Sequence, residues 1–166
     1  FDGLPIPYRA VAADIENGEA VVIGEGDLAV AARASMAVPG LFAPVEMQGR
    51  KLVDGGIANN LPVDVAQAKG VDVIIAVELY ADLKKAEELT NPLSIAGQMI
   101  SLLLEQNSKL QRAKLKSKDI LIAPDLKGFS AADFAKAEDL MARGEAAARA
   151  LKATLKALSR PKDEYQ

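Results

Sequence analysis

The chain has 166 residues, of which 50% are hydrophobic and 26% are charged, and its net charge is −3. These values describe one soluble globular domain and exclude a disordered tail. A sequence pI near 5.1 argues against a nucleic-acid partner, because neutralising phosphates requires a basic surface. The chain contains neither cysteine nor histidine, which excludes disulfides, thiolate or imidazole metal ligands and a histidine base within it.

The N-terminal part is predicted to form short strands and helices joined by tight turns. Asn17-Gly18 predicts a type I′ hairpin, because both central residues of that turn need positive φ, and Gln48-Gly49 predicts a second hairpin. Asp27 is a candidate N-cap of a helix that Pro39-Gly40 ends, and Pro62 suits the first turn of another helix. The expected strands are residues 8–15, 19–23, 45–47 and 51–53, and the expected helices are residues 27–36 and 62–69.

The C-terminal part is predicted to contain longer helices. Residues 71–79 (VDVIIAVEL) form a nearly continuous apolar run, which is typical of a strand covered on both faces. We expect a loop at 84–91, a helix at 92–116, a strand at 120–123, a short helix capped by Ser130 and a helix at 137–158. Strands that alternate with helices indicate an α/β fold with a mostly parallel sheet.

The residues that could take part in catalysis or binding lie in two clusters, 33–42 (RASMAVPGLF) and 54–62 (DGGIANNLP). Asp54 follows a predicted strand, and Gly55 and Gly56 place no side chain in the way of a substrate or another backbone segment. Asn60 precedes a helix start, where its amide can cap the helix or orient the Asp54 turn. Taken alone, Asp-Gly-Gly is most often only a structural turn.

Together the two clusters resemble the patatin-like phospholipase family, in which R-A-S-x-x-x-P-x-x-F precedes D-G-G/A-x-x-x-N-x-P. The resemblance extends over about residues 4–150, and NPLSIAGQMISLLLEQN is similar to the bacterial branch. It implies a three-layer α/β/α fold and hydrolysis of lipid acyl esters by a serine–aspartate dyad without cofactor or metal. It also implies that Asp54 is the catalytic base, while a serine in a G-x-S-x-G elbow is the nucleophile.

The chain departs from the family pattern because it contains neither G-x-S-x-G nor a glycine-rich oxyanion loop. A nucleophile elbow needs small flanking residues because its turn is sharp. The chain also begins Phe-Asp-Gly, without an initiator Met or a signal-peptide pattern. We therefore interpret residues 1–166 as the C-terminal part of one patatin-like domain, inactive by itself. Its expected partner is the N-terminal half that carries the serine.

Arg33 and Ser35 have two interpretations each. Ser35 lies within a predicted helix, not at an elbow, so we expect a buried hydroxyl bonded to the backbone near the site. We expect Arg33 to hold the Asp54 turn or the helix end in preference to contacting substrate. Both residues, with Gly55, Gly56 and Asn60, are therefore predicted to shape the site.

The predicted helix at 92–116 has a wide apolar stripe and a lysine-rich end. One interpretation is a core helix with a solvated basic end. The other is an interfacial helix that meets a lipid surface or a second subunit in a homodimer.

The preferred function is a lipid acyl hydrolase of the phospholipase A or lysophospholipase type that acts on phospholipid at a membrane interface. The alternative is a non-catalytic patatin-like module for lipid binding or oligomerisation. The compartment stays open between bacterial cytoplasm and secretion, and peripheral membrane contact is a further open alternative.

Overall fold

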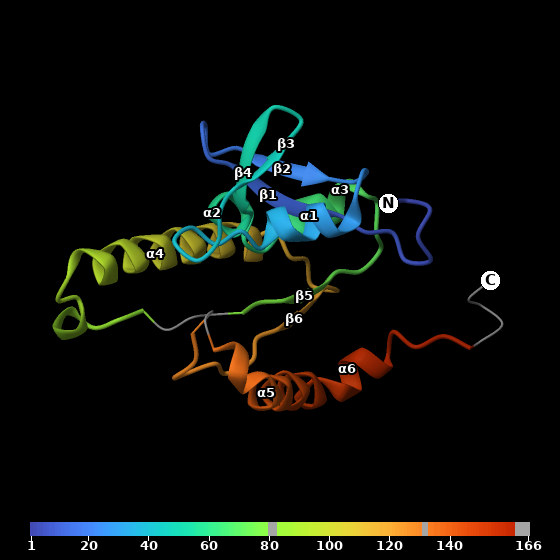
Figure 1. Ribbon diagram of the computed structural model, residues 1–166. Coiled ribbons are helices and arrows are strands. Elements are labelled where there is room, and N and C mark those ends of the chain that lie inside the picture. The colour runs from blue at the N-terminus through green and yellow to red at the C-terminus, as the bar shows by residue number, and fades with distance from the viewer. Residues whose placement is uncertain (80–82, 131–132, 162–166) are drawn as a thin grey trace.

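The computed structural model describes residues 1–79, 83–130 and 133–161, which form two sheets and several helices (Figure 1). The first sheet contains β1 (Ala10–Asp14), β2 (Ala20–Ile23), β3 (Val45–Met47) and β4 (Arg50–Asp54) in the order β2-β1-β4-β3. The second sheet pairs β5 (Ile75–Val77) with β6 (Ile120–Ile122). The predicted α/β class is therefore confirmed, with one antiparallel and one parallel sheet.

Parallel pairing is confined to β5 and β6 among the described strands, whereas the three pairings of the first sheet are antiparallel. The mostly parallel sheet expected from the sequence is thus not seen in these residues. The reason is that short hairpins can only join antiparallel strands, while a parallel pair needs a long crossover. The segment between β5 and β6, which contains α4 (Pro92–Arg112), is such a crossover.

Both predicted hairpins are present, but the prediction of a type I′ turn at Asn17-Gly18 is wrong, and Gln48-Gly49 has that geometry instead. Gln48 and Gly49 both have positive φ, of 51° and 76°, as a type I′ turn requires. In the first hairpin only Gly18 has positive φ, and its N–H donates to the Asp14 carbonyl. Asn17 instead accepts a hydrogen bond from the Glu19 N–H through its side chain, which makes a longer turn.

The first core lies between the four-stranded sheet and α1 (Leu28–Ser35), which Asp27 caps by accepting from the Val30 N–H. Its buried residues include Ala10, Ala12, Ala31 and Ala34, whose small side chains let the helix approach the sheet closely. A second core joins α3 (Val63–Ala68) to β5 and β6 through Leu61, Val63, Ile74 and Ala76.

The described residues cover the β5 segment on one face only, so cover of the second face by the expected N-terminal half stays a prediction. Ile74, Ala76 and Glu78 are buried, while Ile75, Val77 and Leu79 are 49%, 52% and 64% exposed. A strand places alternate side chains on opposite faces, so an apolar run shows that both faces can be covered and not that they are. The exposed row leaves an apolar surface on this sheet.

The remaining helices differ from the predictions mainly at their ends. Helix α4 ends at Arg112, and the expected C-terminal helix is divided at Leu151 into α5 (Ala137–Ala150) and α6 (Lys152–Lys156). The other elements are α2 (Gly56–Asn59) and the 3-10 helices η1 (Ala86–Glu88) and η2 (Phe134–Lys136). The short helix expected after Ser130 falls on residues 131–132, which lie outside the described ranges.

Candidate active site

Asp54 is the last residue of β4. It pairs with β1 in the sheet and precedes the turn that starts α2. Its main chain is fixed twice, because it pairs with Ala12 of β1 and its N–H donates to the Ala37 carbonyl over 3.0 Å. The side chain is half-buried, and its Oδ1 accepts the Gly56 N–H at 2.8 Å. The carboxylate is therefore held at a strand end by its own strand and by the following turn.

Two opposing effects set the proton affinity of Asp54. Burial raises the pKa of this carboxyl, and the Gly56 N–H lowers it by a smaller amount, so that the pKa stays above its ordinary value. A carboxylate with a raised pKa is a stronger base than an exposed one. The arrangement at Asp54 therefore suits proton acceptance from a neighbouring hydroxyl.

Gly55 and Gly56 allow close approach within the protein. A Cβ at Gly55 would overlap the main-chain carbonyl oxygen of Val11 in β1, so backbone fills this space. A Cβ at Gly56 would lie 2.5 Å from Leu104 Cδ2 of α4. The sequence suggested that either a substrate or another backbone segment lies close to the glycines. At Gly55 it is the backbone of β1.

Asn60 is turned toward α4 and does not cap a helix. Its Nδ2 donates to Ser108 Oγ over 2.9 Å, and α3 begins after Pro62 without a side-chain cap. Its Oδ1 lies beside Gly56, where a Cβ would come within 2.8 Å of it. The alternative expectation, that Asn60 orients the Asp54 turn, is consistent with this position.

The first sequence cluster meets the Asp54 turn through its backbone. The Gly55 N–H points to the Ser35 carbonyl at 3.4 Å, so Ser35 contacts the turn by its main chain and not by the expected hydroxyl. The Arg33 guanidinium donates to the Ala43 carbonyl at 3.2 Å and lies 4.9 Å from the centre of the Phe42 ring. Arg33 thus holds the loop after α1, because its side chain leaves the last turn of the helix toward Phe42.

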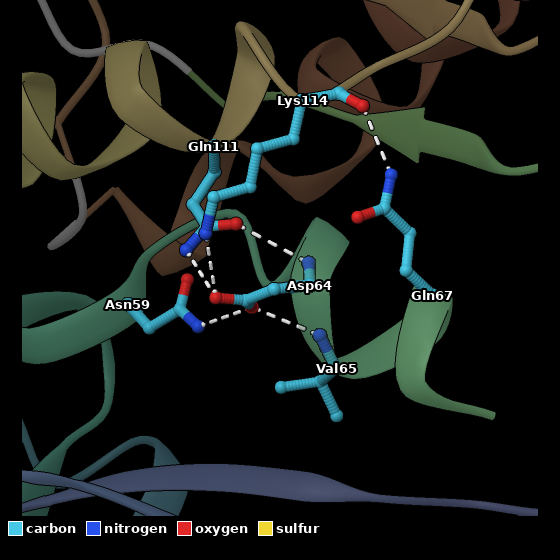
Figure 2. A network of polar contacts seen from close by, with 6 residues as sticks. All are labelled: Asn59, Asp64, Val65, Gln67, Gln111 and Lys114. Carbon is cyan, nitrogen blue, oxygen red and sulfur yellow. Dashed lines mark hydrogen bonds and ion pairs between the residues drawn. The ribbon is translucent and has the colours of Figure 1, made fainter.

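The structure also brings in a set of polar residues that sequence analysis did not single out (Figure 2). Asp64 accepts hydrogen bonds from Asn59 Nδ2, Gln111 Nε2 and Lys114 Nζ at 2.7 to 2.9 Å. Burial alone would raise the pKa of Asp64, but these donors together hold it well below its usual range. Asp64 is therefore a firmly ionised tie between α3 and α4.

Helix α4 carries a polar row on its inner face. The row consists of Asn107, Ser108 and Gln111, which contact residues 56–64, while Leu104 covers Gly56. Their spacing of three to four residues within an otherwise apolar helix is the sequence signal that indicates a polar contact face. Near its end, Arg112 forms a 2.8 Å ion pair with the buried Glu78 after β5.

Neither of two cavities found in the described residues includes Asp54. A cavity of about 410 Å³ lies at the outer end of β2 and β4 and is lined in part by Arg9, Gly24 and Arg50. A smaller one of about 130 Å³ lies between Asn60, Leu61 and the end of β5. Within the described ranges, no three acidic side chains come together as a metal site would require.

Comparison with known proteins finds the family described as patatin-like phospholipase, whose profile matches residues 10–67. An uncharacterised NTE family protein of Mycobacterium bovis is 49% identical over 79 residues, which are 48% of this chain and 22% of that protein. A second uncharacterised NTE family protein from this organism is 29% identical over 171 residues, which cover 90% of this chain and 29% of that protein. Patatin-like phospholipase domain-containing protein 7 of Mus musculus is 37% identical over 93 residues, which cover 55% of this chain and 7% of that protein.

The chain thus spans less than a third of the length of each of these relatives. The family segment begins with β1 and ends in α3, so it contains both sequence clusters and the whole Asp54 turn. Residues 10–67 thus match the patatin-like phospholipase family, and the relatives named above are similar to this chain over 79 residues or more.

Proposed function

We propose that this chain supplies the aspartate of a serine–aspartate dyad in a lipid acyl hydrolase of the phospholipase A or lysophospholipase type. The observation that carries the proposal is Asp54, a half-buried carboxylate of raised pKa at the end of β4. Its turn lies within the segment matched to the patatin-like phospholipase family. The direct test is release of fatty acid from phospholipid vesicles by the full-length protein and by its Asp54→Asn variant.

In the proposed reaction a serine hydroxyl attacks the ester carbonyl and its proton passes to Asp54. Because Asp54 Oδ1 already accepts the Gly56 N–H, we assign the proton to Oδ2. The tetrahedral intermediate expels the alcohol, which takes up the proton, and leaves an acyl-serine. Water then attacks the acyl-serine, Asp54 accepts the proton of that water, and the fatty acid leaves while the serine recovers a proton.

The proposed partner of this chain is the N-terminal half of the domain, which carries the serine and the oxyanion hole. The exposed row of Ile75, Val77 and Leu79 supports this partner, because a three-layer α/β/α fold covers both faces of its sheet. Neither cavity found here includes Asp54, which fits a substrate site that a second half completes. On this proposal, residues 1–166 by themselves do not hydrolyse esters.

The pH dependence of hydrolysis follows from the raised pKa of Asp54. The base must be ionised, so kcat/KM is expected to fall as the pH drops through that pKa, with a midpoint above the ordinary value of 3.8. Asp64 cannot produce this limb, because its pKa is lowered. The measurement is kcat/KM against pH on a soluble short-chain ester, and a midpoint at or below 3.8 would contradict Asp54 as the base.

A lipid surface is the proposed contact of the outer face of α4. Figure 1 shows the N-terminal half of this helix extending beyond the four-stranded sheet. Apart from Leu93 in its first turn, its exposed large apolar residues form one stripe, which we call the outer row: Ile95, Met99, Leu102, Leu103 and Leu110. Residues 92–104 carry no charge, and Asn107, Ser108 and Gln111 face inward. This is the reverse of a solvated surface helix. Among the described helices, none is both long and apolar enough to cross a bilayer.

The outer row predicts loss of vesicle binding in the full-length protein when a charge enters it. Met99 is 62% exposed, and Met99→Glu is expected to weaken binding to anionic phospholipid vesicles at least about tenfold, because a desolvated carboxylate opposes insertion. Gln106→Glu, one position of the same helix that is already polar, is the matched control and should change binding less. Sedimentation of vesicles measures both variants. A change in dimerisation with unchanged vesicle binding would assign the row to a second subunit.

A further inference from the structure

We propose that Asn107 is a positioning residue for Asp54, and that it acts by fixing the turn that donates to the carboxylate. Its Nδ2 donates to two successive carbonyl oxygens of α2, those of Gly56 at 3.3 Å and Ile57 at 2.5 Å. An amide nitrogen has two hydrogens, so one side chain can satisfy both acceptors. This inference rests on the proposed function, since it concerns the base of that reaction.

The turn and the strand end are held by different contacts. Asp54 itself stays in place through its pairing with Ala12 and its bond to the Ala37 carbonyl. Gly56, whose N–H lowers the pKa of Asp54, begins a helix of only four residues with no side-chain cap. Such a short helix has little stability of its own. The first peptide of the turn is held by the Gly55 N–H bond to the Ser35 carbonyl, and the contacts from α4 hold the following part of the turn, which begins at Gly56.

Three residues of α4 contact this short helix or the residue that follows it. Leu104 packs on Gly56, Asn107 binds the two carbonyls and Ser108 accepts from Asn60. Beyond them, Gln111 and Lys114 bind Asp64 at the start of α3 (Figure 2). Among these residues Asn107 alone bonds to the main chain of α2, at the two peptides that directly follow the Gly56 N–H, so it is the α4 residue best placed to hold that N–H toward Asp54.

Asn107→Ala should loosen the turn without moving the strand end. Asp54 then stays buried but loses part of the Gly56 hydrogen bond, and its pKa should rise further. In the full-length protein, kcat should fall about ten- to a hundredfold with KM little changed, because the base is misplaced and substrate contacts are not. The acid limb of kcat/KM should move to higher pH together with this loss.

The conservative variant and the control separate positioning from stability. Asn107→Gln keeps both donor hydrogens and should restore much of kcat and of the acid limb. Gln106→Ala lies on the exposed side of the same helix and should leave both unchanged. If Asn107→Ala does not fold, Asn107→Ser takes its place. The Ser side chain is too short to reach the two carbonyls. Asn107→Ser should therefore move the acid limb of kcat/KM to higher pH, whereas Asn107→Gln should not.

A second readout does not depend on catalysis. The carboxyl pKa of Asp54 can be followed by ¹³C NMR in the full-length protein labelled at aspartate, and Asn107→Ala should raise it. An unchanged or lowered pKa, or equal behaviour of the Ser and Gln variants, would overturn the positioning role. Full activity of Asp54→Asn would overturn the dyad instead. The NMR titration would then still decide whether Asn107 controls the carboxylate.

Discussion

Asp54→Asn is expected to reduce kcat of the full-length protein by about 10²–10⁴, because the amide cannot accept the serine proton. The loss can be larger if serine and aspartate act as one unit. No histidine exists in this chain to take over as base. Steady-state hydrolysis of a phospholipid or a soluble ester measures the effect, and a variant that keeps more than about a tenth of the activity would show that Asp54 is not the base.

The same substitution should leave the fold intact or slightly stabilise it. Folding raises the pKa of Asp54, so the folded state binds its proton more tightly than the unfolded chain does. The stabilising contribution of the protonated form is lost as the pH rises through the folded-state pKa. At neutral pH the ionised carboxylate therefore opposes folding, and Asn removes that opposition while keeping an acceptor for the Gly56 N–H.

A matched control for Asp54→Asn is Asp27→Asn, the same chemical change at an exposed helix N-cap. Asn caps helices about as well as Asp, so activity and thermal stability should both stay close to wild type. If Asp54→Asn unfolds the full-length protein while Asp27→Asn does not, the Asp-Gly-Gly segment acts as a structural turn. That result would contradict the assignment of Asp54 as a base placed at the cost of stability.

Gly55→Ala is expected to destabilise the full-length protein by about 3 kcal/mol or more. The new methyl group would overlap the Val11 carbonyl oxygen, which belongs to the backbone of a strand paired on both sides. Strain in φ does not contribute, because Gly55 has φ of −66°, which alanine adopts readily. The midpoint of urea unfolding measures the effect, and it should fall with the slope unchanged.

Gly97→Ala is the control for this effect, because a Cβ at Gly97 would meet nothing within 4 Å. Gly97 lies inside α4, where alanine is favoured by about 1 kcal/mol, so this variant should be neutral or slightly more stable. Equal unfolding midpoints for the two alanine variants would mean that β1 can yield at Val11, and that the close approach does not constrain the Asp54 turn.

Local sequence signals predicted the elements around Asp54 well. Asp27 caps α1, Gln48-Gly49 joins the strands of the expected hairpin and Asp54 ends β4. These features depend on residues close in sequence, namely a side-chain acceptor near free N–H groups and a turn that needs positive φ. The two clusters likewise led to the family that comparison confirms, because their spacing is itself a local property.

Predictions failed where distant segments decide the outcome. The alternation of strands and helices suggested a mostly parallel sheet, but among the described strands only β5 and β6 pair in parallel. Arg33 was expected to hold the Asp54 turn or the helix end, and its contact with Phe42 depends on how the chain returns after Pro39-Gly40. A local sequence pattern indicates which contacts a side chain can make. The packing of helices and strands decides which of these contacts is formed.

By itself the sequence determined that this chain carries Asp54 on a glycine turn, lacks an imidazole base and shares the paired clusters of the patatin-like phospholipases. Only the tertiary structure decided what surrounds that carboxylate. Val11 fills the space beside Gly55, and Asn107 comes from a helix 50 residues away to bind Ile57. The physical reason is that burial and hydrogen-bond geometry, which set the pKa of Asp54, arise from contacts between segments far apart in sequence.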